Sequence, residues 1–231
     1  MSHPTIDEAA VRVSAGGVTL DGNLTLPDAA AGVVLFAHGS GSSRFSPRNR
    51  FVAEQLWAAG LGTLLIDLLT ADEEQAERFT RHLRFDIGLL ANRLAAATDW
   101  LAADPRTTHL PVGYFGASTG GGAALVAAAA TPGRVAAVVS RGGRPDLAGD
   151  ALPRVTAPTL LIVGGDDEPV VGMNRWALAR LGSPVKELAI VPGATHLFEE
   201  PGTLGEVARR AADWFARHLA PADDATAGRG R

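Results

Sequence analysis

The chain has 231 residues, of which 46% are hydrophobic and 20% charged, and its formal net charge is −4 at pH 7. This composition is typical of a one-domain globular protein, and its interspersed acids and bases give no basic surface for nucleic acid or membranes. The chain has no cysteine, which excludes disulfides, thiolate metal ligands and a cysteine nucleophile.

The ends of the chain carry little pattern. The first ten residues lack the charged and apolar regions of a signal peptide, and no apolar run reaches the roughly 18 residues of a membrane-spanning helix. We therefore expect a cytoplasmic protein with a single domain over residues 1–220. Residues 221–231 are small, polar and aperiodic, so we expect them to form a disordered tail.

Two kinds of strand pattern follow in chain order. Alternating apolar and polar residues on both sides of Gly16-Gly17 predict an opening β-hairpin, with a bulge or kink at Asp21-Gly22. Six short apolar runs come next, and such runs are typical of strands buried on both faces of a parallel sheet. They begin at Ala31, Leu61, Leu110, Val135, Ala157 and Val185.

Helical patterns separate these apolar runs. They cover Pro47–Ala59, Arg84–Ala103, Ser118–Ala130, Val170–Leu181 and Thr203–Leu219. Strands that alternate with helices in this way predict an α/β fold with a doubly wound, mostly parallel sheet. The stretch from Leu68 to Arg84 is rich in charge, and we interpret it as a solvated loop and helix face that could overhang a site.

The stretch from Tyr114 to Leu125 contains the strongest motif. Ligands of open α/β sheets bind beyond the carboxyl ends of the strands. Here Gly116, Ser118 and Gly120 form G-x-S-x-G between a predicted strand and a predicted helix, which is the pattern of a nucleophile elbow. The glycines would leave room for a strained turn that exposes the serine. The alternative is a small residue in a glycine-rich turn.

Partners for a serine nucleophile follow in the order that an α/β-hydrolase requires. An acid and then a histidine should lie at later strand ends. His196 alone among the six histidines follows the acid and a strand end, so we assign it as general base. Asp166, Asp167 and Glu168 are the candidate acids. The spacing favours Asp167 as the residue that orients the histidine, with Asp166 as a brace of the turn.

Two backbone amides are expected to stabilise a developing oxyanion. One belongs to Thr119, which follows the proposed nucleophile, and the other to Ser40 in the glycine-rich loop after the first buried strand. His38, directly before that loop, is interpreted as a residue that shapes the turn.

Arginines at strand ends are candidates for substrate binding. Arg141 and Arg144 flank two glycines, and Arg44 and Arg48 lie beyond the first buried strand. Each could clamp a substrate carboxylate or form an ion pair with a loop acid. The paired acids in the chain lack nearby histidines at ligand spacing, so we expect no metal.

The segments around these motifs resemble the α/β-hydrolase superfamily and, within it, the dienelactone-hydrolase-like group. They begin at Phe36, Gly113, Leu160 and Pro192, and the resemblance extends from the first hairpin to the last helix. It implies a serine hydrolase without a cofactor, acting on a small ester as a carboxylesterase does. Dienelactone hydrolases use a cysteine where this chain has Ser118, so dienelactone is not assumed as the substrate. The segment from Arg141 to Thr156 is too short for the cap domain of lipase-like relatives.

Three other functions are compatible with parts of the sequence. A hydrolase scaffold can bind a ligand without catalysis. An acyltransferase or perhydrolase would use the same three residues. Nucleotide binding by the loop from Gly39 to Arg44 is disfavoured, because the third glycine of G-x-G-x-x-G is replaced by Arg44. The sequence predicts a small-molecule ester as partner and leaves the oligomeric state open.

Overall fold

The computed structural model describes residues 6–80 and 82–219. Its centre is an eight-stranded sheet with the order β1-β2-β4-β3-β5-β6-β7-β8. The predicted hairpin of β1 and β2 is antiparallel, β2 pairs antiparallel with β4, and the other pairs are parallel. The strands are β1 (Ile6–Ala15), β2 (Val18–Pro27), β3 (Val33–Ala37), β4 (Gly62–Ile66), β5 (Val112–Ala117), β6 (Ala137–Arg141), β7 (Thr159–Gly164) and β8 (Lys186–Val191).

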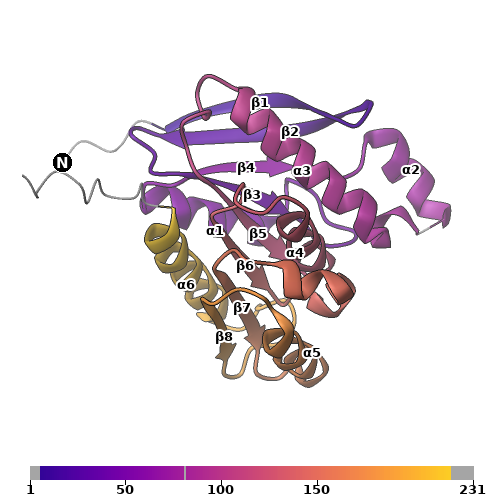
Figure 1. Ribbon diagram of the computed structural model, residues 1–231, viewed down its shortest axis with the longest axis vertical. Helices are drawn as coiled ribbons and strands as arrows, with labels where there is room; N and C mark the ends of the chain where they lie inside the picture. The colour runs from indigo at the N-terminus through magenta and orange to yellow at the C-terminus, as the bar shows by residue number, and fades with distance from the viewer. Residues whose placement is uncertain (1–5, 81, 220–231) are drawn as a thin grey trace, which may run out of the picture.

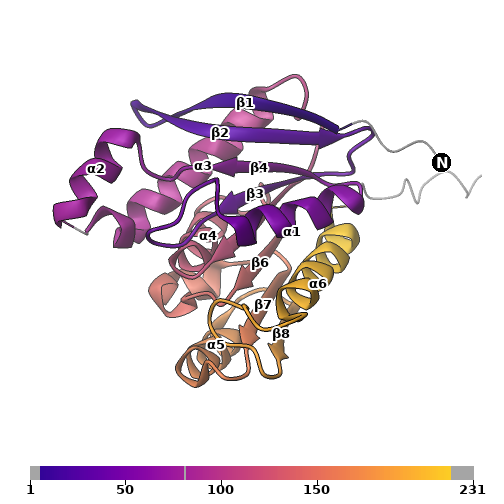
Figure 2. The same ribbon diagram turned by 180° about the vertical axis from the view of Figure 1, so that it is seen from behind.

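Helices cover both faces of the sheet, as the alternating pattern predicts. Figure 1 shows α3, α4 and α5 on one face, and Figure 2 shows α1 and α6 on the other. The helices are α1 (Pro47–Ala58), α2 (Ala71–Thr80), α3 (Ile87–Ala103), α4 (Thr119–Ala130), α5 (Glu168–Arg180) and α6 (Thr203–His218). Two 3₁₀ segments, η1 (Leu83–Phe85) and η2 (Pro145–Arg154), complete the described elements. The predicted α/β architecture with an N-terminal antiparallel hairpin is confirmed, and the segment in which the resemblance to lipase-like proteins would have allowed a cap contains η2.

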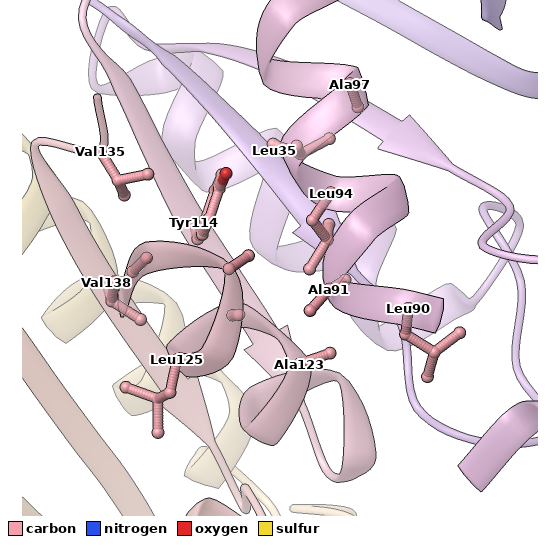
Figure 3. Close-up of a cluster of buried hydrophobic side chains, with 14 of the residues drawn as sticks. Leu35, Leu90, Ala91, Leu94, Ala97, Tyr114, Ala123, Leu125, Val135 and Val138 are labelled. Carbon is pink, nitrogen blue, oxygen red and sulfur yellow. The ribbon is translucent and has the colours of Figure 1, made fainter. Parts of the chain in front are cut away.

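The core follows from the residue types of the central strands. Every residue of β3 to β7 is buried, because helices pack on both faces of a parallel sheet. Figure 3 shows one side of this core, where Leu35, Tyr114 and Val138 of the sheet meet Leu94 of α3 and Leu125 of α4. The Tyr114 hydroxyl lies 2.6 Å from Thr98 Oγ1, and burial raises the pKa of Tyr114 to about 12.

The bulge expected at Asp21-Gly22 is absent. The hairpin register runs without interruption through Asp21↔Arg12 and Gly22↔Val11. Gly22 has a different role, because a Cβ there would lie 3.0 Å from Ile66 Cγ2 of the neighbouring strand. The glycine is therefore explained by close packing of β2 on β4.

The strand order places a crevice at one position along the sheet. β3 lies between β4 and β5, so the chain leaves β3 toward one side and returns to β5 on the other. Ligands of open α/β sheets bind at such a switch point. The loop that contains Ser40 follows β3, and Ser118 follows β5.

Two expectations concern the chain beyond the sheet. The disordered tail predicted for residues 221–231 lies outside the described residues. Within the described ranges, none of the helices combines the length and apolarity needed to cross a membrane.

Candidate active site

Ser118 lies on the sharp turn between β5 and α4. Its backbone has φ 50° and ψ −121°, a conformation that costs energy for any residue with a side chain. Neighbouring loops hold it there. The Ser118 N–H donates to the Arg141 carbonyl at 3.2 Å, and the Ser118 carbonyl accepts from Gly121 and Arg144 N–H at 3.0 Å each. The strain is therefore supported by backbone hydrogen bonds on both sides of the residue.

Gly116 and Gly120 are required by contact. A Cβ on Gly116 would lie 2.6 Å from the Gly120 carbonyl oxygen, and one on Gly120 would lie 2.1 Å from that of Ala37. No side chain fits at either distance. The two glycines of G-x-S-x-G thus let β5, α4 and the end of β3 approach each other around Ser118.

His196 and Asp167 complete a hydrogen-bonded chain with Ser118. His196 Nε2 lies 3.3 Å from Ser118 Oγ, and His196 Nδ1 lies 2.6 Å from Asp167 Oδ2. Asp167 follows β7 and precedes α5, and its carboxylate makes no capping bond to that helix. Asp166 is exposed, and its N–H donates to the Ala194 carbonyl at 3.0 Å. The structure brings together the three side chains that the sequence predicts.

The loop that carries His196 has a brace that the sequence analysis missed. Thr195 donates to Glu200 twice, from its backbone N–H at 3.1 Å and from its hydroxyl at 2.6 Å. These bonds hold the pKa of Glu200 below its usual value. The neighbouring Glu199 accepts from Arg48 Nη1 at 3.0 Å. A T-H-x-x-x-E spacing was the signal available in the sequence.

The two expected oxyanion donors lie next to each other, but one is occupied. Thr119 is the first residue of α4, and its N–H has no backbone acceptor within the described part of the chain. The Ser40 N–H donates to Thr119 Oγ1 at 2.9 Å. The Ser40 loop also lies close to the nucleophile, since a Cβ on Gly39 would be 3.2 Å from Ser118 Cβ. Thr119 thus provides one expected oxyanion donor with its own N–H, and its hydroxyl binds the other donor, the Ser40 N–H.

His38 fixes the start of the Ser40 loop. Its Nδ1 lies 2.9 Å from the Gly39 carbonyl, and its Nε2 accepts from the Leu68 N–H at 3.0 Å. Burial lowers the pKa of His38, which keeps the ring neutral and able to accept this bond. The interpretation of His38 as a shaping residue agrees with these contacts.

A pocket of about 240 Å³ opens above Ser118, and its wall contains an unusual arginine. Arg141 is 7% exposed, and no ion pair joins it to an acid in the described ranges. Its Nε is buried and has no hydrogen-bond partner in the part of the chain that the structure describes. Burial together with the nearby Arg48 charge lowers the pKa of Arg141 to about 10. The guanidinium therefore remains charged at neutral pH, and a buried charge without a counter-ion is costly.

Two other polar atoms in the same wall are also buried and have no hydrogen-bond partner among residues 6–80 and 82–219. They are Arg48 Nε and Asn49 Oδ1. By contrast, Arg44 donates from its side chain to Asp67 and Asn23, and Arg144 pairs with Asp146 at 2.7 Å. Of the predicted arginines, only Arg141 and Arg48 line the Ser118 pocket.

Comparison with known proteins agrees with this geometry. The profile of the Dienelactone hydrolase family matches residues 20–220. The chain belongs to this family. Membership supports a hydrolase activity and confirms the resemblance seen in the sequence.

Solved structures extend the comparison. The dienelactone hydrolase from Anabaena variabilis ATCC 29413 is 66% identical, with a TM-score of 0.91 over 93% of this chain and 99% of that one. Est1E from Butyrivibrio proteoclasticus is 17% identical with a TM-score of 0.75, over 92% of this chain and 99% of its own. A cold-adapted esterase from an Arctic intertidal metagenomic library is 21% identical with a TM-score of 0.76, over 95% and 97%. The two distant esterases show the shared fold.

Curated relatives carry a different name. Proteins from two strains of Mycobacterium tuberculosis, CDC 1551 / Oshkosh and H37Rv, are 59% identical over 216 residues and are named "Putative phosphoribosyl transferase". The match covers 94% of this chain and 48% of each relative. The chain thus spans about half the length of these relatives.

Proposed function

We propose that this chain hydrolyses a carboxylic ester with Ser118 as nucleophile, His196 as general base and Asp167 as the group that orients the histidine. The hydrogen-bonded chain from Ser118 Oγ through His196 to Asp167 carries the proposal. It lies at the end of a strained elbow and within a family of hydrolases. A serine of purely structural use would need neither the strain nor the two partners.

The reaction follows from the two hydrogen bonds. His196 Nε2 takes the proton of Ser118 Oγ as the oxygen attacks the ester carbonyl carbon. Asp167 holds the other ring nitrogen as a donor and stabilises the imidazolium. The tetrahedral intermediate then expels the alcohol, which receives the proton from His196. Water attacks the acyl-enzyme by the same route, releases the acid and restores Ser118.

The oxyanion of each intermediate would accept from the Thr119 and Ser40 amides. The Ser40 N–H must exchange its bond to Thr119 Oγ1 for one to the substrate. The Ser40 N–H needs to move only a short way for this exchange, because Thr119 directly follows the nucleophile. The Thr119 hydroxyl would thus hold the Ser40 loop in place until substrate binds.

The Ser118 pocket supports an ester that carries a negative charge. Arg141 and Arg48 place two buried guanidinium nitrogens without partners in its wall, and the residues that line it include no acid. A carboxylate is the group that arginine binds most specifically. We assign Arg141 as the main carboxylate ligand. Arg44, bound to Asp67, is better explained as a structural residue.

We infer that the phosphoribosyl transferase name of the mycobacterial relatives refers to the half of those proteins that this chain does not match. The region in common matches the Dienelactone hydrolase family over residues 20–220. The hydrogen-bonded serine within it suits acyl transfer. Acyl transfer to an acceptor other than water would use the same residues and would be seen as a second product when an alcohol is added.

The test is hydrolysis of p-nitrophenyl esters from acetate to long acyl chains by the purified protein. Ser118→Ala should lower kcat by about 10⁴-fold or more, because it removes the nucleophile. Ser14→Ala, at an exposed serine on β1, serves as the control and should change nothing. A fluorophosphonate probe should label the wild type and Ser14→Ala but not Ser118→Ala. Equal hydrolysis by the Ser118→Ala variant would contradict the proposal.

A further inference from the structure

A second, larger cavity adjoins the Ser118 pocket. It has a volume of about 710 Å³, against about 240 Å³ for the pocket. The two share Ser42, Ser46 and Arg48 in their walls. We call this cavity the α2 groove, because it runs from the loop after β3 to the start of α2 and the second strand of the hairpin. Figure 1 shows α2 beside the turn of that hairpin.

The α2 groove and Arg141 lie on opposite sides of Ser118. The sheet order runs β2-β4-β3-β5-β6, and Ser118 follows β5. Arg141 ends β6, on one side. The groove is lined by Asp21 of β2 and Asp67 at the end of β4, on the other side. An ester whose carbonyl lies at Ser118 can therefore extend one half toward Arg141 and the other into the groove.

The groove differs from the pocket in its charges. Three arginines and three acids line it, and most of them are paired. Arg44 binds Asp67, and Arg84 binds Glu77 at 3.0 Å and lies 3.8 Å from Glu74. The groove is thus electrically balanced, which does not favour a second charged group in the ligand.

Its remaining polar groups suit hydroxyls. Five Ser or Thr residues line the groove. They are Thr19, Ser42, Ser43, Ser46 and Thr70. The hydroxyls of Ser43, Ser46 and Thr70 each accept from a backbone N–H and can still donate to a ligand. Asp21 is exposed and has no ion pair within the described residues, so its carboxylate is available as an acceptor. Phe45 is 55% exposed in the groove wall and offers an apolar surface for carbon atoms.

We propose that the α2 groove binds the alcohol half of the ester and that this half is uncharged and polyhydroxylated, as in a glycerol or sugar ester. The inference rests on the proposed function of Ser118. The acyl half remains attached to the serine after the first step and suits the small pocket with Arg141. The alcohol half must leave, and the wide groove with its exposed wall provides the exit.

The experiment compares two esters of succinic acid that have the same acid and the same carbon chain in the alcohol. They are the monopropyl ester and the mono-2,3-dihydroxypropyl ester. After division by their rates of alkaline hydrolysis, kcat/KM should be about tenfold higher for the dihydroxypropyl ester, as two net hydrogen bonds predict. Asp21→Asn should lower this ratio about threefold or more. Phe45→Ala removes an apolar contact that both alcohol chains can make, so it should lower kcat/KM for both esters and leave the ratio unchanged.

Matched controls separate the groove from general surface effects. Phe85→Ala removes a phenylalanine with 54% exposure that does not line the groove, and Asp28→Asn changes an exposed acid in the turn after β2. Both should keep the wild-type ratio and the wild-type kcat/KM for each ester. Equal corrected rates for the two esters, both lost in Ser118→Ala, would overturn the groove proposal and leave the ester hydrolase standing.

Binding gives a readout that does not depend on turnover. Calorimetry of both intact esters with the Ser118→Ala variant should show tighter binding of the dihydroxypropyl ester, and Asp21→Asn in that background should reduce the difference in affinity about threefold or more. If the wild type hydrolyses neither ester, the proposed function fails for this substrate class. The groove proposal is then tested by calorimetry alone. Tighter binding of the dihydroxypropyl ester supports it, and equal affinities for the two esters overturn it.

Discussion

The Ser118 pocket and the α2–η1 segment differ in whether their buried polar groups have hydrogen-bond partners. In the pocket wall, Arg141 Nε, Arg48 Nε and Asn49 Oδ1 are buried and have no partner within the described residues. In the α2–η1 segment, the buried carboxylate of Glu77 accepts five hydrogen bonds. The donors are Thr80 Oγ1, the backbone N–H groups of His82, Leu83 and Arg84, and Arg84 Nε, at 2.8 to 3.1 Å.

The contrast distinguishes polar groups that are available to a ligand from polar groups that stabilise the fold. A buried polar group without a partner costs free energy, so native proteins keep few of them. Three of the six such side-chain atoms in the described residues belong to the wall beside Ser118, where a ligand could complete their bonding. The fully hydrogen-bonded carboxylate of Glu77 has a structural role, since it connects α2 to the residues of η1.

The largest effect should come from Arg141→Met. It should lower kcat/KM for an anionic ester by about 10- to 100-fold relative to a neutral ester of equal size, as the loss of charged hydrogen bonds predicts. The same change removes a buried charge whose pKa is lowered to about 10. The free energy of unfolding should therefore rise, on the order of 1 kcal/mol. Kinetics with both esters and urea denaturation measure the two effects.

Arg44→Met is the matched control for Arg141→Met. Arg44 is partly buried and bound to Asp67 and Asn23, so its loss should lower the free energy of unfolding by roughly 1–3 kcal/mol. It should leave the preference for the anionic ester intact. The assignment of Arg141 to ligand binding and of Arg44 to structure would be contradicted if Arg44→Met abolished the preference or if Arg141→Met destabilised the fold.

A smaller effect is expected at Thr119. Thr119→Val removes the acceptor of the Ser40 N–H, so the Ser40 loop loses a positioning bond. We expect kcat to fall about tenfold with little change in KM, because a Ser40 loop without this bond is less well positioned to turn its N–H to the oxyanion. Thr119→Ser keeps the hydroxyl and should restore turnover. Wild-type kcat in Thr119→Val would show that the loop does not need this bond.

The smallest effect on turnover should come from Glu77, where the change is in acid stability. Burial alone would raise the pKa of Glu77, but the donors from Leu83, Arg84 and Thr80 outweigh it and lower the pKa to about 2. The unfolded chain has the ordinary, higher value. Stability from Glu77 is therefore present above about pH 4.5 and lost as the pH falls toward 2.

Urea midpoints at pH 7, 4 and 2.5 test this sign. Glu77→Gln should lower the midpoint at pH 7 and flatten its fall in acid, because the titrating group is gone. Glu187→Gln, at an exposed acid on β8, should follow the wild-type profile. An unchanged acid slope in Glu77→Gln would show that Glu77 does not carry the effect.

Much of the site was predictable because its signals are local. Ser118 lies in a motif whose glycines are dictated by contacts of 2.6 and 2.1 Å, and Asp167 and His196 follow strands whose apolar runs are plain in the sequence. Strand alternation likewise gave the layers and the hairpin. Arg144 and Asp146 are two residues apart, so their ion pair was open to inference.

Other features depend on partners that are distant in sequence. Arg44 and Asp67 are joined across two strand-end loops, and no spacing rule relates them. Glu77 belongs to a stretch interpreted as a solvated face, and its burial depends on a turn that comes after it in the chain. Gly22 also depends on a distant partner, because its close packing against Ile66 leaves no room for a side chain. In the sequence alone, a glycine inside a strand indicates a bulge equally well.

The loop from Gly39 to Arg48 serves two ends of the site at once. It contains the Ser40 amide at the nucleophile and the residues Ser42, Phe45 and Ser46 in the wall of the α2 groove. A substituent that fills the groove would therefore restrain the same segment that stabilises the oxyanion. Part of the binding energy gained far from the scissile bond would then be expressed as faster turnover, in addition to tighter substrate binding. Truncated substrates should then lose kcat as well as affinity.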